Sequence, residues 1–313
     1  PLLNIRLVFL AVLQVIAALV LSAATKRPNI IVFLVDDYDK PETSVYGGKV
    51  LTPNLDRMAR EGITFDNAHV TSTVCTPSRY TFLTGRYAGS SYSREFLDLF
   101  PEGQQTLPGF NMELEEDNMN VGAVLAKNGY ATGFVGKYHV GHGQGLRDKI
   151  LHDVPKNVPY TPRINTWQFE NEKRFRELVK ARGFTWAGNI YWSNTKAPFQ
   201  MHNPEWTIEA ALDFVEAHKD GPFYLHYCTT LLHGPNGQWF KSLDHPEVTG
   251  EGRIPYRRRS MPPRKTVMER IRKAGLTENE AGYLWMDDSL GVLLDRLEKL
   301  GISDNTLVLF LQD

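Results

Sequence analysis

Residues 28–37 have the sequence PNIIVFLVDD, and the architecture of the chain follows from this segment. The run from Asn29 to Val35 is apolar and rich in β-branched residues, which predicts a strand buried on both faces. Two acidic residues, Asp36 and Asp37, follow directly where this strand ends. A strand of this kind is typical of a parallel sheet that helices cover on both sides.

Outward from this strand, helical and extended patterns alternate. Helices are predicted over residues 53–61, 77–84, 121–128, 207–218 and 277–300, and strands over 63–65, 131–135, 222–228 and 306–311. Residues 141–205 and 234–275 read as long irregular segments, the first with a helix around 171–181. This pattern predicts an α/β fold with a mainly parallel, mixed central sheet sandwiched by helices.

The N-terminal residues have the composition of a targeting signal. Arg6 precedes an apolar stretch over residues 7–21, and the small residues Ser22, Ala23 and Ala24 follow. This order predicts a secretory signal peptide over residues 1–24, and an uncleaved membrane anchor is the alternative. We therefore expect export to a periplasmic, secreted or lysosome-like compartment, with no stable membrane span after cleavage. The folded domain is predicted over residues 25–313.

The bulk composition limits the classes of partner. Of the 313 residues, 42% are hydrophobic and 23% charged, which is ordinary for a globular protein with a large core. The formal net charge of −1 gives no support to a nucleic-acid partner. Any anion must therefore be bound by a local cluster of cations.

Charged side chains follow the ends of four predicted strands. They are Asp36, Asp37, Lys137, His233 and Asp313. Because ligands bind at the carboxyl ends of parallel strands, we expect these side chains to converge on one site. Three carboxylates suit a hard divalent cation with oxygen ligands, Ca²⁺ or Mg²⁺. The alternative is that each aspartate only caps nearby backbone amides.

Cys75 stands just ahead of the predicted helix at residue 77, in the segment Cys75-Thr76-Pro77-Ser78-Arg79. A helix N-terminus favours anions and lowers the pKa of a thiol, so the residues alone predict a thiolate nucleophile with His139 or His233 as its base. The alternative is a small buried apolar residue. Cys228, the second cysteine, lies in an apolar strand and reads as a buried thiol.

This segment, together with Leu83-Thr84-Gly85-Arg86, resembles the formylglycine signature of the sulfatase family, within the alkaline phosphatase superfamily. The resemblance extends along the chain. Its further segments are residues 28–37, 52–56, 62–65, 136–141, 287–300 and 306–313.

The resemblance implies a role for each candidate residue. Cys75 is converted by a maturation enzyme to formylglycine, whose hydrate attacks a sulfate ester. Asp36, Asp37 and Asp313 bind Ca²⁺, which formylglycine at position 75 also contacts. Cationic and imidazole groups hold the reacting atoms and move protons; they are Arg79, Lys137, His139 and His233. The implied substrate is a sulfated carbohydrate or a small aryl sulfate.

In that family an Asn or His and a later Lys follow the position of Asp313, and a smaller C-terminal subdomain completes the protein. The 313 residues do not contain them. We therefore expect this chain alone to bind metal weakly and to have little activity. Two alternatives stay open: a phosphate or phosphonate ester hydrolase on the same scaffold, and an inactive protein that binds sulfated glycans with Cys75 unmodified.

Overall fold

The computed structural model describes residues 26–141, 158–234, 237–255 and 260–313. The predicted signal peptide lies outside these residues. Within them, no helix combines the length and apolar character that crossing a membrane requires.

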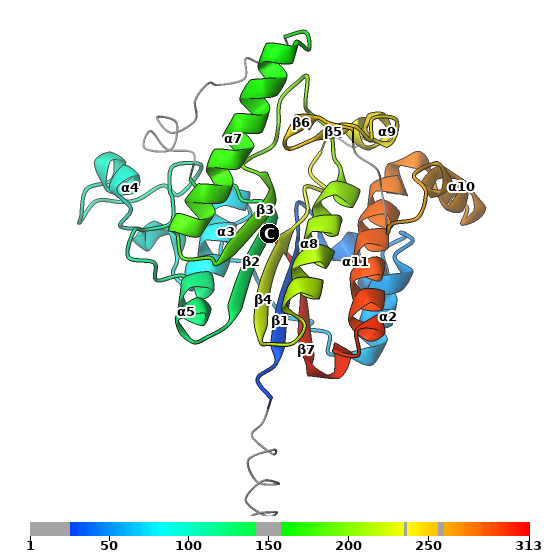
Figure 1. The fold of residues 1–313 in the computed structure, drawn as a ribbon, viewed down its shortest axis with the longest axis horizontal. Helices are drawn as coiled ribbons and strands as arrows, with labels where there is room; N and C mark the ends of the chain where they lie inside the picture. Colours follow the sequence, from blue (N-terminus) through cyan, green and yellow to red (C-terminus); the bar gives the residue numbers. More distant parts are fainter. Residues whose placement is uncertain (1–25, 142–157, 235–236, 256–259) are drawn as a thin grey trace, which may run out of the picture.

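A five-stranded sheet forms the centre of the molecule (Figure 1). Its strands in spatial order are β3 (Trp186–Tyr191), β2 (Ala131–Lys137), β4 (Phe223–Cys228), β1 (Asn29–Val35) and β7 (Thr306–Gln312). Every pairing between them is parallel. The one antiparallel pairing in the described residues joins two short strands outside this sheet, β5 (Val248–Thr249) and β6 (Gly252–Arg253). The predicted mainly parallel α/β fold is thus confirmed.

Helices cover both faces of the sheet (Figure 1). On one side lie α3 (Cys75–Thr84), α5 (Val121–Lys127) and α7 (Pro162–Ala181), and on the other α2 (Pro53–Glu61), α8 (Pro204–His218) and α11 (Ala281–Lys299). Strand β1 serves both layers, because Ile31 and Phe33 pack with the core of α8 and α11, whereas Val32 and Leu34 pack with that of α3 and α7. This explains its uninterrupted apolar sequence.

Shorter helices complete the described chain. They are α4 (Arg94–Leu99), α9 (Gly237–Leu243), α10 (Lys265–Lys273) and single 3₁₀ turns at Lys40–Glu42, Ser44–Tyr46, Ala88–Ser90, Glu278–Glu280 and Ser303–Asn305.

Three sequence predictions about the elements were wrong. Residues 63–65 form no strand and pair with no described strand, and Ile63 is 82% exposed. Residues 141–205 contain strand β3 and a helix, α7, that begins at Pro162 rather than near residue 171. Residues 234–275 are not one loop, since α9, α10 and the β5–β6 pair lie within them.

A buried carboxylate joins the helices of one layer. Asp287 on α11 accepts hydrogen bonds from the backbone N–H groups of Asn54 at 3.0 Å and Leu55 at 2.8 Å, and from Asn54 Nδ2 at 2.8 Å. These amides lie in the first turn of α2, where helix N–H groups have no partner inside the helix. Asp287 therefore caps α2 from a neighbouring helix.

Candidate active site

The carboxyl ends of β1, β2, β4 and β7 bring the predicted residues to one edge of the sheet. Asp36 and Asp37 follow β1, Lys137 ends β2, and Asp313 follows β7. Helix α3 adds Cys75 and Arg79 from the adjacent layer, one helical turn apart on the same face. The convergence expected from the sequence is present in the structure.

Asp36 lies between two cations in the interior. Its Oδ2 is 2.5 Å from Lys137 Nζ, and its Oδ1 is 3.2 Å from Arg79 Nη2. All three side chains are almost completely buried. Burial alone would raise the pKa of Asp36, but Lys137 and Arg79 hold that pKa below its ordinary value. Asp36 is therefore a carboxylate in this structure.

Arg79 also contacts Lys137 at the end of β2 and Asp313 after β7. Its Nη1 donates to the carbonyl of Lys137 at 2.9 Å, and its Nη2 is 2.5 Å from Asp313 Oδ2. Burial opposes its charge, but Asp313 and Asp36 raise the pKa of Arg79. The guanidinium thus joins α3 to three strand ends with a permanent positive charge.

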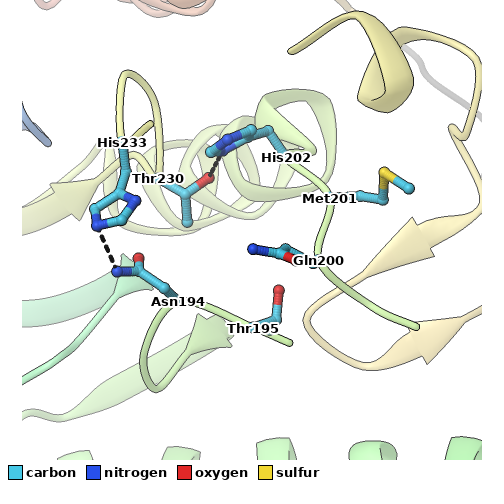
Figure 2. A pocket seen from close by; sticks show the side chains of 7 residues that line it. All are labelled: Asn194, Thr195, Gln200, Met201, His202, Thr230 and His233. Atoms are coloured by element: carbon cyan, nitrogen blue, oxygen red, sulfur yellow. Dashed lines mark hydrogen bonds between the residues drawn. The ribbon is translucent and has the colours of Figure 1, made fainter. Parts of the chain in front are cut away.

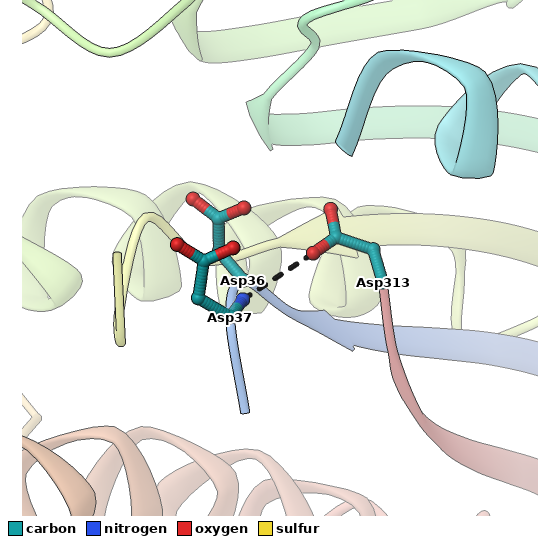
Figure 3. A group of neighbouring side chains, drawn as sticks. All are labelled: Asp36, Asp37 and Asp313. Carbon is teal, nitrogen blue, oxygen red and sulfur yellow. Dashed lines mark hydrogen bonds between the residues drawn. The ribbon is translucent and has the colours of Figure 1, made fainter. Parts of the chain in front are cut away.

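Asp36, Asp37 and Asp313 form a carboxylate group that fits a divalent cation (Figure 3). One oxygen from each lies within 4.8 Å of the others. The backbone N–H of Asp37 donates to Asp313 Oδ1 at 3.3 Å, while Asp313 Oδ2 is buried and pairs with Arg79 Nη2. Burial raises the pKa of Asp313 to about 6. Carboxylate oxygens gathered in this way are the ligands that a hard divalent ion prefers. The thiol of Cys75 is not among the atoms of this group.

Cys75 is in the first turn of α3, two residues earlier than the helix start predicted from Pro77. Its Sγ lies 3.1 Å from Nδ1 of His139, and Thr76 Oγ1 donates to the carbonyl of His139 at 2.8 Å. The His139 ring packs against Phe110, with ring centroids 5.5 Å apart. The structure therefore pairs Cys75 with His139.

The prediction of a lowered thiol pKa was wrong. Burial raises the pKa of Cys75, and this effect outweighs the opposing charges of Lys137 and Arg79. The nearby carboxylates Asp36 and Asp313 raise it further. A neutral thiol is a weak nucleophile, so the structure disfavours direct attack by an unmodified Cys75.

Local backbone conformation aims two of these side chains. Gly136 has φ +87°, and a Cβ there would lie 1.8 Å from the carbonyl oxygen of Cys228. The β2–β3 register shifts between Val135 and Gly136. Bulges of this kind redirect side chains beside active sites, and here the next residue is Lys137. His139 has φ +47°, a left-handed conformation that is uncommon outside glycine.

His233 lies at the mouth of the site. Its Nε2 accepts a hydrogen bond from Asn194 Nδ2 at 2.8 Å and lies 3.8 Å from Asp37 Oδ2, while its Nδ1 donates to the carbonyl of Gly234 at 3.0 Å. The side chain is one-third exposed. His233 therefore faces both the carboxylate group and solvent.

Polar residues next to His233 were missed from the sequence. Figure 2 shows a pocket lined by Asn194, Thr195, Gln200, Met201, His202, Thr230 and His233. Asn194 follows the end of β3. Recognising that strand would have placed Asn194 among the other strand-end residues. For His202, two residues ahead of α8, the sequence carries no distinguishing signal.

Known proteins are similar to this chain along most of its described length. A family model described as Sulfatase matches residues 28–313. The chain belongs to the sulfatase family. Similar proteins include N-acetylgalactosamine-6-O-sulfatase of Bacteroides thetaiotaomicron, 27% identical over 342 residues, which cover 92% of this chain and 59% of the relative. Human N-acetylgalactosamine-6-sulfatase is 27% identical over 312 residues, covering 93% of this chain and 51% of the relative. This sulfatase chain thus spans between half and three-fifths of the length of these relatives.

Solved structures share the sulfatase fold. A Bacteroides thetaiotaomicron structure, from work on the metabolism of multiple glycosaminoglycans, has a TM-score of 0.58 at 21% identity and covers 91% of this chain and 62% of its own. The PsFucS1 sulfatase from Pseudoalteromonas sp. has a TM-score of 0.50 at 21% identity, covering 92% and 55%. These likenesses concern the fold.

Proposed function

We propose that this protein hydrolyses sulfate esters, with a sulfated carbohydrate as substrate, at the site around Cys75. The observation that carries the proposal is the convergence of Cys75 with one buried Arg–Lys pair, two histidines and three aspartates at a single sheet edge. Family membership supports the same reaction class.

We propose that Cys75 is the precursor of formylglycine, made by a dedicated maturation enzyme. The formylglycine hydrate would supply the attacking hydroxyl. An uncharged thiol is a weak nucleophile and would not take its place. The raised pKa of Cys75 supports a precursor rather than a thiolate. His139 Nδ1 lies 3.1 Å from Sγ, within reach of a proton on any group at that position.

Asp36, Asp37 and Asp313 are the residues that would hold the metal, Ca²⁺ or Mg²⁺. A bound cation would polarise an ester oxygen and stabilise negative charge. Arg79 and Lys137 add two fixed positive charges from the side of α3 and β2. In a buried site these charges favour an anionic group and the charge that develops on it during cleavage.

His233 would deliver a proton to the departing alcohol. Its Nδ1 donates to a backbone carbonyl, so its Nε2 is the nitrogen directed at the site. This nitrogen lies 3.8 Å from the carboxylate oxygen of Asp37, beside the proposed metal ligands. In this proposal His139 exchanges protons with the group at position 75, and His233 gives a proton to the leaving group.

We also propose that residues 1–24 are a signal peptide that directs export of the protein and is then cleaved. The basic residue, apolar stretch and small residues in that order support this. Exported protein should have a mature N-terminus close to residue 25 by mass spectrometry. Material that retains the first 24 residues would contradict cleavage there.

The reaction class is tested by comparing two esters on one preparation. Protein made together with a formylglycine-generating enzyme should hydrolyse 4-nitrophenyl sulfate in preference to 4-nitrophenyl phosphate. A preference for the phosphate would assign the site to a phosphate ester hydrolase. Loss of both activities in a Cys75→Ala variant locates the reaction at this site.

A further inference from the structure

The pocket beside His233 has features of a built binding site. It encloses about 40 Å³ between the segment that follows β3 and the loop that follows β4 (Figure 2). His233 lies in its wall, and this links the pocket to the carboxylate group through Asp37. The pocket is therefore next to the carboxylate group, on the side of His233.

One residue that lines this pocket has a ring nitrogen without a hydrogen-bond partner among the described residues. His202 is 6% exposed, yet its Nε2 forms no hydrogen bond with any described residue. The rest of the residue is fixed, since Nδ1 bonds Thr230 Oγ1 at 2.9 Å and the backbone N–H donates to Ser242 Oγ at 2.9 Å. A buried polar atom without a partner costs about 1–3 kcal/mol, so a ligand that completes this bond gains affinity.

The pocket is built for an uncharged group. Its described lining contains no lysine, arginine, aspartate or glutamate. His202 adds no charge, because burial lowers its pKa to about 4 and keeps the ring neutral. A second sulfate would find no fixed cation here, whereas the active site itself has Arg79 and Lys137.

A hydroxyl group matches both the chemistry and the size. It can donate or accept, so it satisfies His202 Nε2 in either ring tautomer. Gln200 lines the same pocket and forms no side-chain hydrogen bond with another described residue, which leaves it as a second polar contact. A water molecule needs about 10–15 Å³ of such space, so the pocket admits a hydroxyl or hydroxymethyl group but not a sugar ring.

We propose that this pocket is a specificity subsite in which His202 binds an uncharged hydroxyl of the sulfated sugar. The proposal rests on the function proposed above and narrows the substrate class. The preferred substrate is a sulfated sugar whose group next to His233 is a free hydroxyl rather than a second sulfate. His202 then determines specificity and takes no part in bond cleavage.

The test measures binding, so that it does not depend on turnover. In a Cys75→Ala background with Ca²⁺ present, calorimetry compares N-acetylgalactosamine 6-sulfate with 4-nitrophenyl sulfate, which has no sugar hydroxyl. We expect His202→Phe to weaken the sugar sulfate about tenfold, the equivalent of about 1.4 kcal/mol, and the aryl sulfate less than twofold. His202→Gln, which keeps a donor and an acceptor, should stay within about threefold of the parent.

His245→Phe is the matched control, because it makes the same change at a histidine that does not line the pocket. It should alter neither affinity. Equal weakening of both ligands by His202→Phe, or no weakening of the sugar sulfate, would overturn the subsite and leave a pocket that holds only water. A selective loss of sugar binding in a protein whose Cys75 form cleaves no sulfate ester would refute the sulfatase function and leave the subsite standing.

Discussion

Replacing Arg79 with methionine removes the guanidinium that faces two buried carboxylates. Its Nη2 lies 3.2 Å from Asp36 and 2.5 Å from Asp313, and its Nη1 donates to the carbonyl of Lys137. Removing one partner of a buried ion pair costs about 3–5 kcal/mol. Proton uptake by Asp313, whose pKa is already about 6, limits that cost. We therefore expect Arg79→Met to lower the free energy of unfolding by about 4 kcal/mol at pH 7.

Urea unfolding in metal-free buffer, followed by tryptophan fluorescence, measures this loss. Arg86→Met is the control, because Arg86 also contacts two carboxylates but is one-quarter exposed, and we expect it to cost about 1 kcal/mol. The Arg79 loss should shrink as pH falls below 6, since Asp313 is then protonated in both proteins. A loss at pH 7 no larger than that of Arg86→Met would refute the assignment of Arg79 as the counter-charge.

Asp287, Gly136 and His233 give three further predictions. Burial raises the pKa of Asp287 to about 7, above its usual value near 4, so its ionisation reduces stability as pH rises between these values. Urea unfolding should show Asp287→Asn losing about 3 kcal/mol less stability than wild type from pH 4 to 7, and equal losses would contradict this. Gly136→Ala would place Cβ 1.8 Å from the carbonyl oxygen of Cys228 and should lower the free energy of unfolding by about 3 kcal/mol or more. The control, Gly301→Ala, should lower it by about 1 kcal/mol, because Gly301 has φ +68° but open space around it. Equal shifts of the urea midpoint would count against the bulge. His233→Ala should reduce kcat on a sugar sulfate about 10²–10⁴-fold and on 4-nitrophenyl sulfate far less, because nitrophenolate departs without a proton; equal losses would remove His233 from leaving-group protonation.

The central architecture could be predicted because its signals are local and strong. Strand β1 occupies the predicted residues, 29–35, since a run without polar interruptions fits only a strand covered on both faces. Helix α2 begins at Pro53, immediately after its N-cap Thr52, and ends at Glu61, as that sequence signal predicts. The convergence of strand ends then followed from parallel topology alone.

The missed elements had weaker or overlooked signals. Strand β3 contains Gly188 and Asn189, which are poor strand formers, and Asn189 adopts φ +50°. Helix α7 carries a Thr161–Pro162 start, the same signal as α2, but the prediction placed the helix some nine residues later. Burial of Cys75 determines the pKa of its thiol, because desolvation outweighs the effect of the helix terminus. A short sequence motif does not show how deeply a residue is buried.

The contacts between side chains across the site could not be predicted from local sequence either. The contact between Asn194 and His233 joins residues 39 positions apart, and both lie next to strand ends whose order in the sheet the sequence does not specify. The roles of Arg79 and Lys137 depend on their shared contact with Asp36, which only the assembled sheet and α3 create. Such contacts follow from tertiary packing.

The state of Cys75 tests the central claim most directly. Protein made in a host that contains a formylglycine-generating enzyme is digested with trypsin, and the peptide that contains Cys75 is analysed by mass spectrometry after alkylation. We predict an aldehyde at position 75 and no alkylation there, with Cys228 alkylated after denaturation. An intact, alkylatable thiol at Cys75 would contradict the proposed chemistry.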